Sequence, residues 1–505
     1  MSEYGLSADV AESQLKEISP TMCYAKWLQV SLHLTNGRTH SCYHPPTHII
    51  PLEDLKRNPS VLHNTSQKKM EREQMLNGEK PEGCSYCWNI EATGNRSDRI
   101  YRSGEYWAQN GRRDIEEAGS TGDVRPRYVE VNFNQACNFK CMYCSPHLSH
   151  SWEEDVHEHG PFMITNPSGH RVGHNDIVYL EKEQLMPFKG NPQDNPYVEA
   201  FWKWWPDIYR HLEVFRLTGG EPLMDVNTYK ILDFIYEHPN AWLELSITSN
   251  LCPPKSSLFE TFVEKLQNIE KTQVWHDPLR FNPGSGNNWY VNNAVKHTSI
   301  FVSLDSVGSQ AEYIRDGLQF DLLQKNVRHL LDNTIYTTVT FINTFNALSV
   351  PRFEDFLAYI LSLRREYAKS RQGIRYVKID VDDPYMTHPD REVLPVQRVW
   401  FDIPLLRYPD WQSIQVLPNK YVSYMENAIQ FMEENQNVDD FVGFYDFEID
   451  KAKRNWQWMK ERSKLPITEI RRHKKNFIDF YKQYDLRRNK NFIKTFPELA
   501  ELLHD

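Results

Sequence analysis

Long apolar runs are missing from this sequence. No stretch approaches the ~20 consecutive apolar residues that a membrane-spanning helix needs, and no basic flank precedes an apolar run with a small-residue cleavage site. An excess of positive charge is also missing, because the formal net charge is −10. We therefore expect a soluble, cytoplasmic protein that has no membrane partner. A general phosphate-binding surface, as nucleic-acid modules carry, is not expected either.

Cysteine is scarce, with eight residues among 505. Seven of the eight fall into two groups, and the remaining one, Cys252, stands directly before Pro253. Thiols stay reduced in the cytoplasm, so grouped cysteines indicate metal ligands or catalytic residues rather than disulfides. We interpret Cys252 as a buried thiol outside both groups.

Composition and patterning along the chain predict five segments. They are a polar leader (1–22), a cysteine-rich domain (23–90), a linker with helix (91–126), the alternating domain (127–385) and a helical C-terminal region (386–505). Cysteines bracket the cysteine-rich domain, and strands alternate with helices in the alternating domain. The C-terminal region is rich in aromatic and charged residues with a helical pattern.

The alternating domain predicts an α/β fold. Short apolar strands that alternate with amphipathic helices are typical of parallel βα units, and six units indicate a partial (β/α)6 barrel rather than a complete eightfold one. Two polar inserts, 159–196 and 270–297, are expected near the barrel rim. The predicted strands are Tyr128–Phe133, Glu213–Leu217, Trp242–Thr248, Ser299–Leu304, Thr337–Ile342 and Arg375–Ile379.

Three cysteines follow the first predicted strand of this domain. Cys137, Cys141 and Cys144 have the spacing CxxxCxxC, with an aromatic residue directly before the last. Three thiolates on one loop can hold three irons of a [4Fe–4S] cluster and leave the fourth iron without a protein ligand. An amino group and a carboxylate of one small molecule could chelate that open iron. For the cysteine motif alone, a zinc site or chance spacing is the alternative.

A second motif, Gly219-Gly220-Glu221-Pro222, follows the next strand about 80 residues further on. Together the two motifs resemble the radical S-adenosylmethionine (SAM) superfamily, and the resemblance covers roughly residues 127–385. It implies that SAM is the ligand of the open iron and that this second motif contacts the SAM amino group. Glycines that allow close backbone approach and a carboxylate that complements an amine agree with this role.

Further strand ends resemble SAM-contacting elements of the superfamily. Asn250 closes the polar end of the third strand, and the Ser303-Leu304-Asp305 run with Arg315 downstream resembles an element of the peptide-modifying branch. The resemblance implies that Ser303 lies near the SAM ribose and that Arg315 pairs with the SAM carboxylate. Asp305 is expected to be structural or close to the ribose. An ordinary strand-end or helix-cap role is the alternative for Asn250, Ser303 and Arg315.

Two acids are candidates for catalysis. Asp380 and Asp382 stand at the predicted end of the last strand, where carboxylates could orient a substrate or accept a proton at the barrel mouth. A solvated loop or a helix cap before Pro384 explains them equally well.

The second cysteine group precedes the barrel. Cys23, Cys42, Cys84 and Cys87 are spaced C-x18-C-x41-C-x2-C, and Cys42 follows a predicted hairpin turn at residues 35–38. The group resembles the twitch/SPASM auxiliary-cluster domain, in which a cysteine-bearing hairpin and a CxxC bind additional [4Fe–4S] clusters. Those domains usually follow the barrel. Four thiolates also suit a structural Zn²⁺, so a second [4Fe–4S] cluster and a zinc site both remain open.

The resemblance as a whole implies a radical SAM enzyme. An electron from a donor such as flavodoxin or ferredoxin would cleave SAM reductively to a 5′-deoxyadenosyl radical, which abstracts hydrogen from a substrate at the barrel mouth. The chain end also resembles bacterial and tailed-phage twitch-domain radical SAM proteins. That branch makes a peptide or protein side chain the first candidate substrate, followed by a small molecule. The alternatives are an RNA- or nucleotide-modifying enzyme and a non-catalytic iron–sulfur or zinc scaffold; nucleic acid is not expected as a partner.

Overall fold

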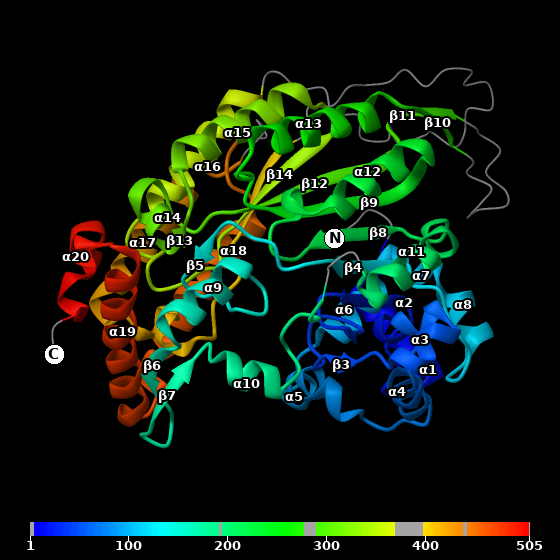
Figure 1. Ribbon diagram of the computed structural model, residues 1–505, viewed down its shortest axis with the longest axis horizontal. Helices are drawn as coiled ribbons and strands as arrows, with labels where there is room; N and C mark the ends of the chain where they lie inside the picture. Colours follow the sequence, from blue (N-terminus) through cyan, green and yellow to red (C-terminus); the bar gives the residue numbers. More distant parts are fainter. Residues whose placement is uncertain (1–4, 191–193, 277–288, 369–396, 438–441, 504–505) are drawn as a thin grey trace. The chain divides into compact units, whose positions relative to one another are not determined.

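The computed structural model describes every residue except 1–4, 191–193, 277–288, 369–396, 438–441 and 504–505. It is a mixed α/β chain in which helices and parallel strands alternate over much of the sequence (Figure 1). The chain divides into two compact units: unit 1 comprises residues 1–135, 184–247 and 271–297, and unit 2 comprises residues 136–183, 248–270 and 298–505.

Six strands of unit 1 lie in the order β9-β8-β4-β1-β2-β3. The pairs β9–β8, β8–β4 and β4–β1 are parallel, whereas β1, β2 and β3 form antiparallel pairs. The cysteine-rich segment thus adds its strands to those of the predicted barrel. The bounds are β1 Gln29–His33, β2 Arg38–His40, β3 His48–Ile49, β4 Tyr128–Asn132, β8 Val214–Thr218 and β9 Asn240–Ser249.

The hairpin between β1 and β2 confirms the predicted turn. His33 pairs with Arg38, and Gly37 adopts φ +65°, a conformation that favours glycine. Residues Ala25–Leu28 form the short helix α2, and β1 follows it directly at Gln29.

The strands of unit 1 separate an apolar from a polar face. Val131 and Leu217 are paired across β4 and β8 and are buried. Their face packs against α11 (Pro196–Tyr209), where the Trp205 ring lies 4.8 Å from that of Phe215. Burial of each such side chain contributes about 1.5–3 kcal/mol. Side chains alternate along a strand, so Glu130 and Asn132 point to the opposite, polar face.

Helices of the N-terminal segment share one core with β4. The core contains Met22, Tyr24, Trp27, Trp107 and Tyr128. Residues before and after the cysteine-rich segment therefore pack together. The helices are α1 Ala8–Ile18, α3 Leu52–Arg57, α4 Ser66–Leu76, α5 Ser85–Ala92, α6 Asp98–Gly104, α7 Tyr106–Asn110 and α8 Arg112–Ala118; α12 (Val226–Glu237) follows β8.

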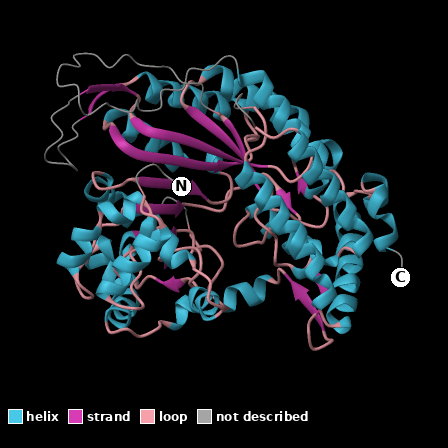
Figure 2. Ribbon diagram, turned by 180° about the vertical axis from the view of Figure 1, so that it is seen from behind, coloured by secondary structure: helices cyan, strands magenta, loops and turns pink. Residues whose placement is uncertain are grey.

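Three parallel strands of unit 2 lie in the order β15-β14-β12. Their bounds are β12 Val295–Ser303, β14 Thr337–Ile342 and β15 Val399–Asp402, so the prediction for β14 is confirmed. The helices α13 (Ser256–Lys271), α15 (Phe320–Asn333) and α16 (Phe353–Ala368) accompany them, and α15 and α16 pack on β14 and β15 (Figure 2).

One strand contradicts the prediction of a purely helical C-terminal region. β15 lies within residues 386–505 and pairs with β14, placing Val339 opposite Val399. A four-residue apolar run carries too little periodicity to be distinguished from helix in the sequence. The predicted strand Arg375–Ile379 lies outside the described residues.

The rest of unit 2 is mainly helical. The hairpin β6–β7 packs on α19, and Arg364 and Glu448 form an ion pair with both side chains fully buried. The bounds are β5 Lys140–Cys141, α9 His150–His159, β6 Phe162–Thr165, β7 Arg171–His174, α10 Ile177–Lys182, α14 Gly308–Ile314, β13 Arg315–Asp316, α17 Val422–Glu434, α18 Asp446–Lys460, α19 Ile467–Arg488 and α20 Phe492–Thr495. The second insert contains the hairpin β10 (Gln273–His276) and β11 (Trp289–Asn292).

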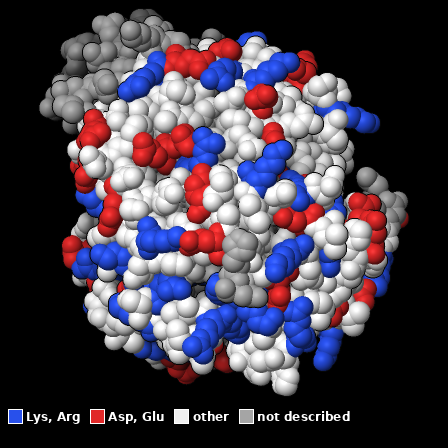
Figure 3. Space-filling view, turned by 90° about the vertical axis from the view of Figure 1, so that its left-hand side faces the viewer, with Lys and Arg blue, Asp and Glu red and all other residues white. Residues whose placement is uncertain are grey.

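The predicted α/β class is confirmed, while the predicted partial barrel is not. Neither row of strands closes on itself within the described residues, so a partial barrel stays a prediction. Among the described helices, none has the length and apolar character required to cross a membrane. Acidic and basic side chains are interspersed on the face drawn in Figure 3.

Candidate functional site

The loop of Cys137, Cys141 and Cys144 belongs to unit 2, where its backbone is held at several points. Cys141 lies in β5 and pairs with Arg315 of β13. The Trp152 indole donates to the Cys141 carbonyl at 2.8 Å, and the Ser151 hydroxyl donates to the Cys137 carbonyl at 2.7 Å. The loop conformation is therefore fixed by contacts to its backbone.

Among the described residues, no three cysteine sulfurs lie within 4.8 Å of one another; the ligand atoms of Asp410, Glu469 and His473 do. Cys137, Cys141 and Cys144 stand on one loop, at the spacing that predicts three ligands of a [4Fe–4S] cluster.

The thiols need a metal to become thiolates. Burial raises the pKa of Cys144 to about 12 and also raises the pKa of Cys141, against the lowering effect of Arg315. A thiol with such a pKa is protonated at neutral pH, and metal binding displaces the proton.

Arg315 connects the cysteine loop to Asp305. The Arg315 Nε lies 2.8 Å from Asp305 Oδ2, and Arg315 Nη1 lies 3.6 Å from the Cys141 sulfur. The Tyr143 hydroxyl donates to Asp305 Oδ2 at 2.9 Å, and the Thr344 amide donates to Oδ1 at 2.8 Å. The carboxylate partner of Arg315 in this structure is thus Asp305, which is fully buried.

Asn250 is tied to the same loop. Its side-chain amide donates to Asn138 Oδ1 at 3.0 Å, and Asn138 Nδ2 donates to the Cys252 carbonyl at 2.7 Å. Leu251 adopts φ +53°, which is unusual for a residue with a side chain. These contacts hold the end of β9 against the cysteine loop. Ser303 ends β12, pairs with Ile342 and is partly buried.

The Gly219–Pro222 motif lies in unit 1 at the end of β8. Gly219 has φ +135°, and a Cβ at this position would approach Asn132 Oδ1 to 2.8 Å. The Gly220 amide donates to the Asn134 carbonyl at 3.3 Å. Asn134 stands three residues before Cys137 in the sequence. The ends of β4 and β8 are therefore locked together immediately before the cysteine loop begins.

Glu221 and Pro222 continue this turn. The Glu221 side chain is 2% exposed and caps the short 3-10 helix Pro222–Met224, where its Oε1 accepts from the Leu223 amide at 3.0 Å. The Glu221 carboxyl group is therefore held in one position. Asp380 and Asp382 lie outside the described residues, so the structure does not place them.

The second cysteine group comes together in unit 1. Cys23, Cys42, Cys84 and Cys87 line one small cavity of about 20 Å³. Burial raises the pKa of Cys23 to about 12 and of Cys42 to about 11. The outermost of the four, Cys23 and Cys87, are 64 positions apart in the sequence and line the same cavity.

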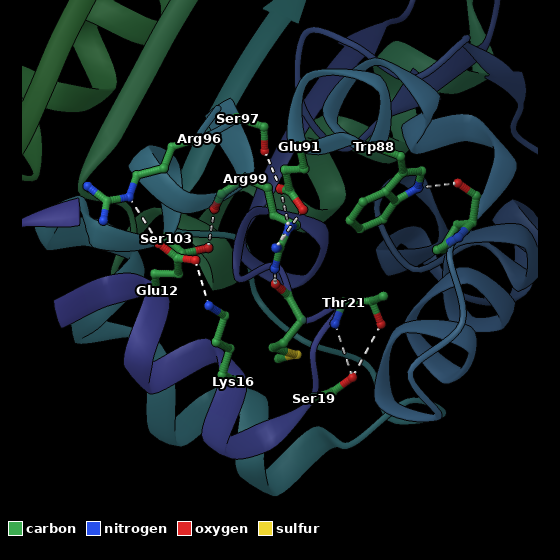
Figure 4. Close-up of polar contacts among 12 residues, drawn as sticks. Glu12, Lys16, Ser19, Thr21, Trp88, Glu91, Arg96, Ser97, Arg99 and Ser103 are labelled. Atoms are coloured by element: carbon green, nitrogen blue, oxygen red, sulfur yellow. Dashed lines mark hydrogen bonds and ion pairs between the residues drawn. The ribbon is translucent and has the colours of Figure 1, made fainter. Parts of the chain in front are cut away.

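Two basic side chains line the same cavity, and no sequence motif indicated them. Lys26 is 2% exposed and donates to Glu71 at 2.5 Å. Arg99 donates to both Glu91 oxygens at 2.9 Å and to the Met22 carbonyl at 2.7 Å (Figure 4). Each of the two cations beside the four thiols is thus paired with a carboxylate.

Comparison with known proteins gives two weak matches. A GTP 3′,8-cyclase from Campylobacter lari is 25% identical over 123 residues, which is 24% of this chain and 27% of that protein. A GTP 3′,8-cyclase from Campylobacter jejuni subsp. doylei is 25% identical over 146 residues, 29% of this chain and 32% of that protein. The chain therefore spans about a third or less of the length of these relatives.

No profile of a known protein family matches the chain. The two matches do not extend to an auxiliary-cluster domain, a substrate or a reaction. With the cysteine loop and the glycine motif, they support assignment to the radical SAM superfamily and no finer assignment.

Proposed function

We propose that this chain is a radical SAM enzyme that holds a [4Fe–4S] cluster on Cys137, Cys141 and Cys144. When bound, the cluster supplies the electron that cleaves SAM to methionine and a 5′-deoxyadenosyl radical, which abstracts hydrogen from a substrate. The observation that carries the proposal is the loop itself: it bears three cysteines at the CxxxCxxC spacing, and its backbone carbonyls at Cys137 and Cys141 are already bonded.

The residues of the chain position and shield the cofactors. Gly219 and Gly220 give SAM close access to the backbone, and Glu221 holds a carboxylate for the SAM amino group. Ser303 ends a strand where the resemblance implies the SAM ribose, and Asn250 follows a strand end that the resemblance implies lies beside SAM. Arg315 has a second role in this proposal. Its guanidinium is fixed by the ion pair with Asp305 and approaches the Cys141 sulfur, so its positive charge stabilises a thiolate there.

The four-cysteine site holds a second [4Fe–4S] cluster in this proposal. Its four cysteines line one cavity, and four thiolates are enough for one fully ligated cluster. Two clusters predict about eight irons per chain, whereas one cluster with one zinc ion predicts about four irons and one zinc.

A peptide or protein side chain is the first candidate substrate, and flavodoxin or ferredoxin is the candidate electron donor, in the cytoplasm. A nucleotide is the second candidate, because both matching relatives are named for a reaction of GTP. A basic surface for RNA is not evident on α19, where Arg472 pairs with Asp410 and Lys475 pairs with Asp479.

The test is SAM cleavage by anaerobically reconstituted protein, measured as 5′-deoxyadenosine formed with dithionite as reductant. We expect the wild type to form it and the Cys144→Ala variant to lose both 5′-deoxyadenosine formation and about half of its iron. Cys252→Ala is the control, because Cys252 is a cysteine of the same unit that belongs to neither group. A full cluster without SAM cleavage would overturn the proposal that the chain is an enzyme and would favour a non-catalytic scaffold.

A further inference from the structure

The C-terminal part of unit 2 is basic, although the chain as a whole is acidic. Residues 461–494 contain eleven Lys and Arg but only four Asp and Glu, whereas the formal net charge of the chain is −10. Most of these basic residues lie on α19, drawn in dark red in Figure 1. A local charge of this kind steers a partner of the opposite sign toward the surface that carries it.

The basic residues at the C-terminal end of α19 are engaged inside the protein. Arg487 Nη1 lies 3.6 Å from Asp155 Oδ2, Arg488 Nη1 lies 3.4 Å from Asp155 Oδ1, and the Asp155 side chain is 2% exposed. Arg471 and Lys482 differ from them, because both are exposed and neither forms an ion pair with another described residue. These two charges are therefore available to a partner.

One face of α19 carries exposed basic residues together with an exposed leucine. Four residues fall within an arc of about 60° on this helix, and we call them the basic stripe: Arg471, Lys475, Lys482 and Leu486. Leu486 is 85% exposed. Asp479 pairs with Lys475 at 2.8 Å and also with Arg171, so one positive charge remains in that group. At a rise of about 1.5 Å per residue, Arg471 and Lys482 stand about 16 Å apart.

Another side of α19 contacts the cysteine loop. The Tyr481 hydroxyl donates to Met142 Sδ at 3.1 Å, and Met142 follows Cys141 directly and is fully buried. The Arg488 guanidinium lies 4.9 Å from the ring of Trp152, whose indole donates to the Cys141 carbonyl. A helix with its side chains is about 10–12 Å across. A protein on the basic stripe would therefore lie about one helix diameter from the loop.

The basic stripe fits a protein better than a polyphosphate. Nucleic acids and anionic membranes are held by many cations that neutralise phosphates, whereas the stripe with its neighbours Asp479 and Arg171 keeps only three positive charges. Protein interfaces combine a charged rim with apolar contact residues, and Leu486 offers such a contact. Opposite charges on the partner speed association and fix its orientation. The expected partner is therefore an acidic protein.

We propose that the basic stripe docks an acidic one-electron carrier protein, such as a flavodoxin or ferredoxin, which delivers the electron for the cluster on the cysteine loop. Electron transfer slows steeply with distance, so a donor has to dock where the cover is thin, and here the cover is the single helix α19. The carrier loses one electron and the cluster gains it, with no bond formed or broken. This assignment rests on the proposed function, because the carrier needs the cluster as its acceptor.

The test measures equilibrium binding of oxidised flavodoxin, and in parallel of an acidic [2Fe–2S] ferredoxin, to the anaerobically reconstituted full chain. We expect saturable binding of at least one carrier that weakens as NaCl rises from about 20 to about 200 mM, since salt screens exposed charges. Lys482→Glu and Arg471→Glu should each weaken binding about five- to tenfold, because the new carboxylate faces an acidic partner. Lys325→Glu is the matched control and should bind as the wild type does: Lys325 is exposed on α15 of the same unit and forms no ion pair with another described residue.

A second measurement separates docking from the enzyme. SAM cleavage by the same samples is driven either by the reduced carrier or by dithionite, a small reductant that needs no docking surface. We expect the two charge-reversal variants to lose most of the carrier-driven rate at sub-saturating carrier and to keep the dithionite-driven rate. Iron content and thermal unfolding report whether each variant is folded.

The proposal is overturned if neither carrier binds the wild type, if the two variants bind as the control does, or if a variant loses both rates equally. It is also overturned if single-stranded RNA or phosphatidylglycerol vesicles bind more tightly than the carrier and lose affinity in the same variants. A wild type that binds the carrier through the stripe but does not cleave SAM with dithionite overturns the enzyme alone.

Discussion

The buried pair of Asp305 and Arg315 gives the sharpest prediction about the site. Asp305 is 0% exposed and Arg315 is 5% exposed, with Oδ2 and Nε 2.8 Å apart. Asp305 also accepts from Tyr143 and from the Thr344 amide. Asp305→Asn keeps the size of the side chain and one acceptor oxygen but removes the charge that compensates Arg315.

Breaking a buried ion pair from one side costs about 3–5 kcal/mol, because the other charge stays buried without compensation. The amide of the variant can still accept from Thr344, so we expect the lower end, about 3 kcal/mol. That is on the order of a hundredfold in the folding equilibrium. Arg315 also approaches the Cys141 sulfur, so lower iron content should accompany the loss of stability.

The measurement is urea unfolding of the reconstituted protein under anaerobic conditions, with iron counted on the same samples. Glu366→Gln is the control, because it removes the carboxylate of an exposed ion pair. Glu366 Oε1 lies 3.1 Å from Arg328 Nε, and the two side chains are 42% and 37% exposed, respectively. An exposed pair contributes about 0–1 kcal/mol. An Asp305→Asn variant within 1 kcal/mol of wild type, or a control that loses as much, would refute the reasoning.

Three further predictions concern unit 1. Gly219→Ala should reduce SAM cleavage more than about tenfold, because its Cβ would lie 2.8 Å from Asn132 Oδ1. Gly94→Ala is the control and should retain SAM cleavage, because Gly94 also has a positive φ but no atom lies within 4 Å of the added Cβ. Equal activities of the two variants would contradict this prediction. Burial raises the pKa of Glu213 to about 7 from 4.5, against the effect of Arg127, so the folded state holds a proton that the unfolded state releases between these pH values. Stability should therefore fall by about 3 kcal/mol as pH rises from 4.5 to 7, and urea titrations of Glu213→Gln should show this dependence lost. Lys26→Met should lower the midpoint potential of a cluster in the four-cysteine site, because a buried cation favours the more negative reduced state. The measurement is a spectroelectrochemical titration. An unchanged midpoint potential, or no redox-active metal in that site, would count against the prediction.

Local sequence was sufficient for the features that depend on neighbouring residues. The turn at Gly37 and the strand Thr337–Ile342 were predicted correctly, because φ preferences and apolar runs act over a few residues. The two cysteine groups and the glycine motif could also be found, since their spacing along the chain carries the chemistry. β15 was missed because its four residues become a strand only through pairing with β14.

Tertiary structure decided how the polar groups are paired. Only packing shows that Arg315 is held by Asp305, that Lys26 lines the four-cysteine cavity, and that Tyr481 contacts Met142 of the cysteine loop. Side-chain contacts between residues far apart in sequence depend on how complete elements pack, and no local preference encodes them. The sequence by itself determined which candidate ligands and motifs this protein has; the fold determined which buried charges surround them.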